Sequence, residues 1–356
     1  MSFVNSNIRF IKRSMWFFFF DYVMWFGATY MIYTFSKTEQ WETLPQWQKY
    51  TINTCYVNWV GFFMWCIFVI GHDCGHSTFS EYEWLNDIVG HVTHASITVP
   101  FYPWQLSHRR HHMYHNHVEK DYSHPWYIPE RLERDDEKLA KYMHKNWLFR
   151  LFFPFVAWPI YLYGMPDGSH FIPFSTQRLW AESETKEYLK CIISSVSVIL
   201  ALTGLYYLYD QSWESLGFYH LIPNLICGWW LITVTYLQHH DPTTLVYDDS
   251  TWKFVDAAFE TVDRKFGFGI DYLHHHITDG HVAHHLFFTK IPHYNLPIAT
   301  KAIKNYLKEN DLLSVYREDV TWDFPYRMHK FFIDHGFKSN IYVPSKHADR
   351  DNKKSQ

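Results

Sequence analysis

Charged residues are scarce in this chain of 356 residues, because Asp, Glu, Lys and Arg together make up 19% of it. Soluble globular proteins usually carry about 25% charge. The formal net charge of −4 gives no excess of Lys and Arg for binding nucleic acid. Cysteine is also rare, and the five Cys include no CxxC pair. We interpret them as small core residues in a reducing compartment.

Two cofactor fingerprints are missing from the sequence. It contains no G-x-G-x-x-G dinucleotide motif and no HPGG-like haem segment. If the chain carries out redox chemistry, we therefore expect its electrons to come from a separate donor protein.

Aromatic residues and histidine are present in excess. Phe, Trp and Tyr make up 21% of the chain, and there are 25 His. The mean hydropathy of −0.27 counts Tyr, Trp and His as polar, yet Tyr and Trp are enriched at membrane interfaces. The negative mean therefore does not exclude a membrane protein.

Four apolar stretches approach the roughly 20 residues needed to cross a bilayer. They lie near 15–35, 51–71, 189–209 and 217–237. Two weaker stretches, 84–102 and 146–164, are interrupted by polar residues or proline, and we expect them to be re-entrant or interfacial. The sequence therefore predicts an all-α integral membrane protein with four transmembrane helices and a cytosolic cap.

Most histidines fall on one predicted face of the membrane. If the N-terminus is cytosolic, the chain returns to the cytosol at Gly71 and again at Leu237. The block His72–His124 that follows the second stretch holds ten His, and the block His239–His293 that follows the fourth holds nine. This grouping requires the two weaker stretches to be both non-spanning or both spanning. We predict one domain over 1–356, with cytosolic histidine regions at 72–146 and 238–300 and a cytosolic tail at 340–356.

Three histidine clusters have the spacing of residues that share one helix face. They are His72 and His76 in GHDCGH, His108, His111 and His112 in HRRHH, and His281, His284 and His285 in HVAHH. One such cluster alone is commonly incidental. Neutral imidazole binds Zn, Cu, Fe and Ni. Eight ligands exceed the four of one tetrahedral zinc, so the clusters predict two adjacent metal ions with open coordination positions.

The remaining histidines differ in their position relative to the apolar stretches and the three clusters. One of His239 and His240, which follow the fourth stretch, is a candidate for a further ligand. His274, His275 and His276 are ambiguous. A structural or solvent-facing role is expected for His91, His94, His115, His117, His124 and His293. Carboxylates near the clusters could orient ligand rings, and these are Asp73, Asp121, Asp241, Asp263 and Asp279.

The segments GHDCGHSTF, PFYPWQLSHRRHH and HVAHHLFFTKIPHYNL resemble the three histidine boxes of membrane fatty-acid desaturases. TYLQHHD, ETVDRKFGFG and HHITDGHVAHHLF resemble the methyl-end branch, which contains Δ12 and ω3 enzymes. HHMYHNHVEKDYSHPW is most similar to the ω3 enzymes of invertebrates. The resemblance runs from about Cys66 to Tyr306.

This resemblance implies a di-iron oxygenase that uses O2 to insert a cis double bond toward the methyl end of an unsaturated acyl chain. It implies His239, or alternatively His240, as a ligand beside the eight box histidines. The substrate would be an acyl-CoA or a phospholipid-bound chain, and cytochrome b5 with its NADH-dependent reductase would supply electrons. Lys353 and Lys354 fit a signal for return to the endoplasmic reticulum, so we expect a multi-pass protein of that membrane.

Other activities fit the same pattern of residues. The ω3 type is favoured, and a Δ12 desaturase is the nearest alternative. A related di-iron acyl hydroxylase or acetylenase would use the same scaffold. Outside the enzymes, a zinc-binding membrane receptor would need fewer histidines and leaves the third box without a purpose.

Overall fold

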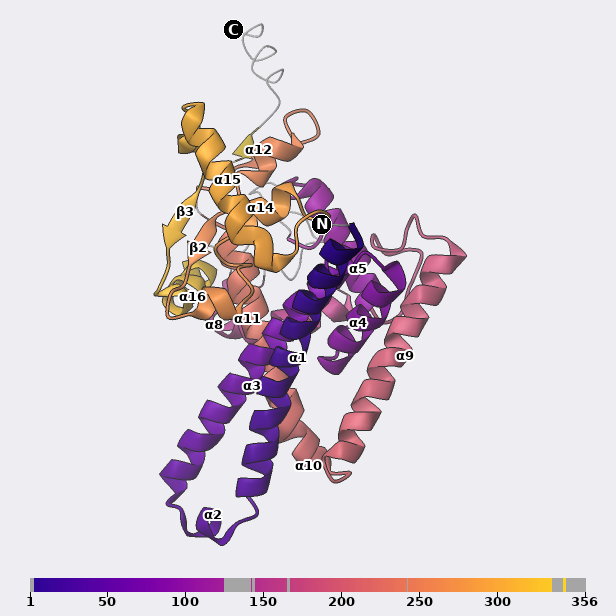
Figure 1. Cartoon of the computed structure of the whole chain (residues 1–356), viewed down its shortest axis with the longest axis vertical. Helices are drawn as coiled ribbons and strands as arrows, with labels where there is room; N and C mark the ends of the chain where they lie inside the picture. The colour runs from indigo at the N-terminus through magenta and orange to yellow at the C-terminus, as the bar shows by residue number, and fades with distance from the viewer. Residues whose placement is uncertain are drawn as a thin grey trace, which may run out of the picture. The chain divides into compact units, whose positions relative to one another are not determined.

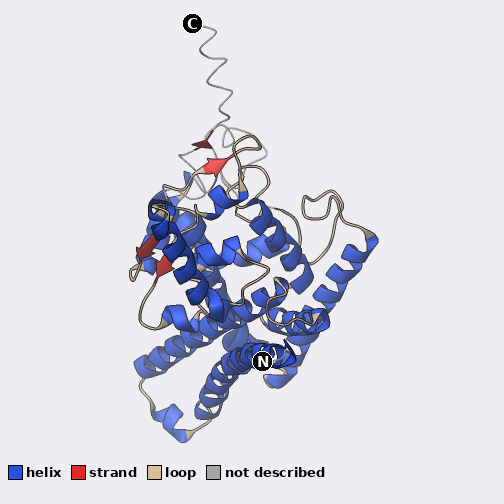
Figure 2. Ribbon diagram, turned by 45° about the horizontal axis from the view of Figure 1, so that its top comes forward, coloured by secondary structure: helices blue, strands red, loops and turns tan. Residues whose placement is uncertain are grey.

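The computed structural model describes residues 3–124, 142, 145–164, 167–241, 243–334 and 342–343. Regular structure in these residues is mostly helical, with a few short strands (Figure 2), which confirms the predicted helical class. The chain divides into two compact units, and each is described by itself.

The first unit comprises Met1–Gln105, Phe155–Tyr163 and Gly168–Leu231. Its helices are α1 (Phe3–Phe35), α2 (Glu39–Thr43), α3 (Gln46–Gly75), α4 (Glu83–Ser96), α9 (Thr185–Leu208) and α10 (Trp213–Leu216), followed by the π-helical turn η1 (Gly217–Leu221). Helices α1 and α3 lie side by side and are joined at one end by α2 (Figure 1). Helix α4 packs on both α3 and α9.

The second unit comprises Leu106–Pro154, Gly164–Asp167 and Ile232–Gln356. Its short helices are α12 (Phe254–Ala258), α13 (Ile270–Leu273), α14 (His281–Leu286), α15 (Leu296–Glu309) and α16 (Phe324–Asp334), with 3-10 turns η2 (His293–Asn295) and η3 (Leu313–Val315). Three helices pass from one unit to the other, namely α5 (Phe101–Tyr114), α8 (Trp147–Tyr163) and α11 (Ile222–His239).

Two pairs of short parallel strands tie distant segments of the second unit together. Strand β1 (Val246–Tyr247) pairs with β4 (Tyr342–Val343), and β2 (Asp263–Lys265) pairs with β3 (Glu318–Val320). Strand β2 places Asp263 opposite Glu318. The β2–β3 pair thus anchors the chain at Lys265, upstream of the third histidine box, which begins at His281.

Three helices are long and apolar enough to cross a membrane: Gln46–Gly75, Thr185–Leu208 and Trp213–His239. They contain the predicted spans 51–71 and 217–237 and nearly all of 189–209. The other predicted span, 15–35, lies within α1, which is not among the three. Its Trp and Tyr side chains count as polar on hydropathy scales, and so does Asp21. The weaker stretches form α4 (14 residues) and α8 (17 residues), both shorter than a span of roughly 20 residues.

Two predicted regions extend beyond the described residues. The tail 340–356, with Lys353 and Lys354, is described only at 342–343, and residues 125–141 of the first histidine region are also outside the description.

Gly71 allows α3 and α4 to approach closely just before the first histidine box. A Cβ atom at this position would lie 2.0 Å from His94 Nδ1 and 2.5 Å from Thr93 Oγ1, and both side chains are fully buried. We expect Gly71→Ala to destabilise the protein by about 1–3 kcal/mol, the usual cost of overpacking a core. The thermal midpoint in detergent should therefore fall.

Gly204→Ala is the matched control for this substitution. A Cβ atom at Gly204, within α9, meets nothing within 4 Å. Replacing a helical Gly with Ala stabilises by about 0.5–1 kcal/mol, so the control should melt at the same temperature or higher. An unchanged midpoint for Gly71→Ala would contradict the close packing of α3 on α4.

Candidate metal centre

The first histidine box lies where helix α3 ends. Residues 60–71 of this helix (VGFFMWCIFVIG) contain no polar side chain other than the Trp65 N–H and are almost all buried, so the helix is apolar on every side until His72. His76 is the C-cap residue of the helix, and the chain turns away at Ser77, which has a φ of 58°. The i, i+4 spacing puts both rings on one side: His72 Nε2 and His76 Nε2 are 3.2 Å apart. Within the first unit, this box therefore presents two buried imidazoles together.

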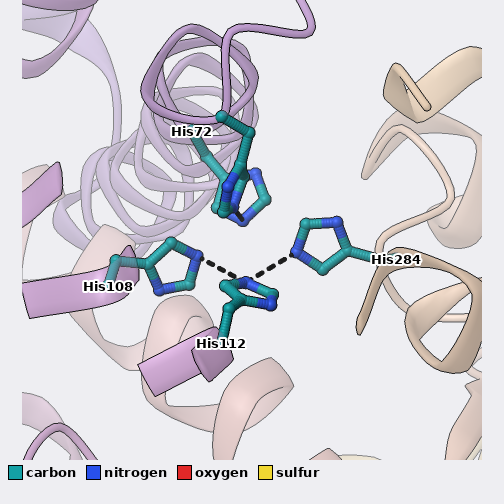
Figure 3. A group of neighbouring side chains, drawn as sticks. His72, His108, His112 and His284 are labelled. Carbon is teal, nitrogen blue, oxygen red and sulfur yellow. Dashed lines mark hydrogen bonds between the residues drawn. The ribbon is translucent and has the colours of Figure 1, made fainter. Parts of the chain in front are cut away.

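The second and third boxes meet inside the second unit. Helix α5 carries His108 and His112 one turn apart, with their Nε2 atoms separated by 3.1 Å. Helix α14 begins directly after Gly280, and His284 on it places its Nε2 3.1 Å from His112 Nε2. Figure 3 shows both contacts as dashed lines that converge on His112.

A second group of imidazoles forms around His239, the last residue of α11. Its Nε2 lies 3.3 Å from His111 Nε2 and 2.9 Å from His281 Nε2. The His285 ring centroid is 4.7 Å from the centroids of both His239 and His281. Helices α5, α11 and α14 thus supply four imidazoles to one small volume. We call His108, His112 and His284 group A, and His111, His239, His281 and His285 group B.

Hydrogen bonding does not account for this convergence. An imidazole nitrogen offers either one N–H or one lone pair, so Nε2 of His112 or His239 forms a full hydrogen bond with one neighbour and only a shared, weaker one with a second. A metal ion does account for it. With metal–nitrogen bonds of about 2.1 Å, ligand nitrogens lie roughly 3.0 Å apart at right angles and roughly 3.4 Å apart at the tetrahedral angle. The observed separations of 2.9 to 3.3 Å are close to this range.

His285 provides a further test of the fit. Both of its ring nitrogens are buried and have no hydrogen-bond partner among the described residues. Leaving a buried polar group unpartnered costs about 1–3 kcal/mol, and a metal bond would remove that cost. Burial, together with the neighbouring His281 and His239 rings, holds the pKa of His285 well below its ordinary value. The ring is therefore neutral, which is the form that binds metal.

Asp121 is the carboxylate that orients a ring of group B. Its Oδ1 lies 2.9 Å from His111 Nδ1 and also accepts the backbone N–H of His124, while Oδ2 accepts the N–H of Asn116. A carboxylate on the outer nitrogen of a histidine is the usual support of a metal ligand. Burial raises the pKa of Asp121 to about 7, and the nearby His124 ring lowers it by a smaller amount. A cation held by His111 would favour the ionised carboxylate.

Asp263 supports the helix that carries the third box. It accepts the backbone N–H of Val282 at 2.8 Å and a hydrogen bond from the Tyr316 hydroxyl. Burial raises the pKa of Asp263 to about 6, although the bond from Tyr316 lowers it. Strand β2 and the first turn of α14 are joined through this side chain.

The other candidate carboxylates lie in different surroundings. Asp241 forms ion pairs with Arg264 and Arg317. Asp279 contacts His276 Nδ1 at 3.0 Å. Asp73 Oδ1 is 3.8 Å from His72 Nδ1, which is beyond hydrogen-bond distance. Asp121, by contrast, lies within hydrogen-bond distance of a box-histidine ring, that of His111.

The structure separates the two candidates that follow the last apolar stretch. His239 joins group B, whereas the His240 ring stacks on Tyr236 with centroids 4.5 Å apart. Among the ambiguous histidines, His276 pairs with Asp279, and the His275 ring packs against His293 at 4.5 Å.

His124 is the residue whose surroundings the sequence did not indicate. Its position in the sequence predicts a structural or solvent-facing role, but its ring centroid lies 4.4 Å from that of His111 and 4.8 Å from that of His239. His124 lies in a loop, outside any helical repeat of histidines, so the spacing of the histidines does not predict its place beside group B. Asp121, three residues earlier, is a carboxylate that the sequence did indicate as a possible support for a ligand ring.

Comparison with known proteins agrees with this geometry. Residues 51–317 match the family described as Fatty acid desaturase. The chain is 42% identical over 297 residues to the Delta(12) fatty acid desaturase fat-2 of Caenorhabditis elegans. The aligned region covers 79% of this chain and 76% of that protein.

Two further relatives carry omega-3 names. The omega-3 fatty acid desaturase fat-1 of C. elegans is 38% identical over 277 residues, covering 74% of this chain and 64% of fat-1. The acyl-lipid omega-3 desaturase (cytochrome b5), endoplasmic reticulum, of Arabidopsis thaliana is 39% identical over 269 residues, covering 73% and 64%.

The chain belongs to the fatty acid desaturase family. Its relatives are Δ12 and ω3 enzymes, so it is a methyl-end acyl desaturase and hence an oxidoreductase. This confirms the family and the branch that the histidine boxes predicted.

Proposed function

We propose that this protein is a di-iron desaturase that inserts a cis double bond toward the methyl end of an unsaturated acyl chain, as a single domain built from both units. The convergence of histidine Nε2 atoms in groups A and B carries this proposal. His72 and His76 would complete group A, and His111, His239, His281 and His285 would hold the second iron. The ω3 type is favoured by the segment that follows the second box, with Δ12 as the alternative.

The bound irons would supply the reduction of O2 to water, coupled to removal of two hydrogens from adjacent methylenes and to the uptake of two electrons and two protons. The chain's own residues hold neutral imidazoles in place, with Asp121 fixing the ring of His111 and Asp263 fixing α14. A saturated segment of acyl chain has no polar group, so its position relative to the imidazoles must decide which bond is oxidised.

The membrane setting follows from the long apolar helices. We propose four spans, with α1 added to the three apolar helices, and both histidine regions on the cytosolic side of the endoplasmic reticulum. An Arabidopsis relative is named for that membrane and for cytochrome b5. Cytochrome b5 with its NADH-dependent reductase is therefore the proposed electron donor. An acyl-CoA and a phospholipid-bound chain are the two candidate substrates.

Expression in a yeast that lacks polyunsaturated lipids tests the proposal. Cells fed oleate or linoleate should accumulate a new cis double bond, and an ω3 enzyme should convert linoleate whereas a Δ12 enzyme should convert oleate. Gas chromatography with mass spectrometry of the total fatty acids measures both. A hydroxylated or acetylenic product would identify the related activities of the same scaffold.

Metal analysis of the purified protein separates the enzyme from a zinc-binding receptor. Two irons per chain are expected for the desaturase. One zinc per chain, with an unchanged fatty-acid profile despite confirmed membrane insertion and a competent donor, would contradict the proposed function.

A further inference from the structure

The two proposed iron sites differ in their number of imidazoles. Group A, with His72 and His76 added by the proposed function, has five. Group B has four, from His111, His239, His281 and His285. If the two ions have similar coordination, group B lacks one nitrogen.

His124 lies beside group B. Its ring centroid is 4.4 Å from that of His111 and 4.8 Å from that of His239. One ligand nitrogen from each of His111, His124 and His239 can be chosen so that all three lie within 4.8 Å of one another. This limit is wider than the separations of 2.9 and 3.3 Å between the closest Nε2 atoms of group B.

The backbone holds His124 at this place. Asp121 accepts the His124 N–H at 3.2 Å and the Asn116 N–H at 3.1 Å, which folds the loop after α5 back toward that helix. The same carboxylate lies 2.9 Å from His111 Nδ1. One buried side chain therefore fixes both the ring of a group B histidine and the position of His124.

His117 shows the contacts of a histidine that stabilises this loop, and they differ from those of His124. His117, in the same loop, places its Nε2 3.1 Å from the exposed carboxylate of Asp249 and uses Nδ1 to accept the N–H groups of Glu119 and Lys120. That is a loop-stabilising histidine. The His124 ring instead lies beside two imidazoles of group B, those of His111 and His239, as expected of rings that share one cation.

We propose that His124 is the fifth imidazole ligand of the iron held by group B. This inference rests on the proposed function, because it requires that group B holds iron. It adds to the three histidine boxes a ligand from the loop that follows the second box.

The test uses the full-length protein, purified in detergent without metal and loaded anaerobically with ⁵⁷Fe(II). Iron content per chain and Mössbauer spectra are compared for wild type, His124→Ala, His124→Gln and the control His117→Asn, whose side-chain oxygen can still accept the loop N–H groups. Wild type and His117→Asn should bind two irons in two environments. Both His124 variants should bind one iron as before and the other at least tenfold more weakly, and free imidazole should restore it in His124→Ala.

The outcomes separate the inference from the proposed function. A wild type that binds no iron contradicts the proposed function itself. A second outcome is that wild type binds two irons and the His124 variants bind two irons equally tightly, with unchanged spectra. This outcome overturns only the role of His124. A loss that free imidazole leaves unrestored also overturns it. His124→Gln keeps most of the side-chain volume, so the comparison stands if His124→Ala does not fold.

Discussion

His111→Ala should abolish the desaturated product while the protein stays inserted in the membrane. His111 contacts a second imidazole through Nε2, at 3.3 Å from His239, and a buried carboxylate through Nδ1, at 2.9 Å from Asp121. Its removal takes one ligand from the proposed iron and leaves Asp121 buried without that partner. Loss of a supporting residue alone costs about 10–100-fold in metal affinity or activity, so we expect a loss of at least about 100-fold.

The measurement is the fatty-acid profile in yeast at matched protein level, together with iron per chain. His329→Ala is the control, because its ring lies on α16 and contacts the Leu151 carbonyl at 3.1 Å, outside both groups. The control should keep its product and both irons. Substantial product from His111→Ala would show that group B is not the oxidising centre.

Helical spacing singled out the eight box histidines, because i, i+3 and i+4 residues share a face whatever lies around the helix. Their role as metal ligands stays a prediction. The choice between His239 and His240 stayed open, since consecutive residues point in different directions and the stacking of His240 on Tyr236 depends on tertiary packing.

Loop and strand contacts could not be predicted in the same way. His124 comes to group B through hydrogen bonds of Asp121 to backbone N–H groups, and no periodic pattern encodes them. Strands β2 and β3 have three residues each. They pair Asp263 with Glu318, two residues that are far apart in the sequence. Strands this short carry too few residues to show an alternating pattern.

The long helices were predicted by composition. Three of the four expected spans coincide with helices that are apolar enough to cross a membrane, and their ends differ by a few residues, as is usual for helix boundaries. The fourth, within α1, depends on how Trp and Tyr are counted. These side chains suit a membrane interface but lower a hydropathy average.

Asp121→Asn should weaken iron binding by about 10–100-fold, which is the usual effect of removing a residue that supports a metal ligand. The carboxylate accepts from His111 Nδ1, from the His124 N–H and from the Asn116 N–H. An Asn side chain has one oxygen, so its amide NH₂ would face one of these donors. The ring of His111 would lose its fixed orientation, and the loop that carries His124 would lose one of its two backbone anchors.

Asp249→Asn is the matched control, since Asp249 also contacts a histidine, His117 Nε2 at 3.1 Å, but its own side chain is 71% exposed. An exposed pair contributes little, so iron affinity should stay as in wild type. Iron affinity is measured by competition with a chelator, and the thermal midpoint of the iron-free protein is measured in parallel. A lower midpoint with unchanged iron affinity in Asp121→Asn would mean that Asp121 only stabilises the fold. A weaker iron site, with the iron-free midpoint nearly unchanged, would identify it as the residue that positions His111 for the metal.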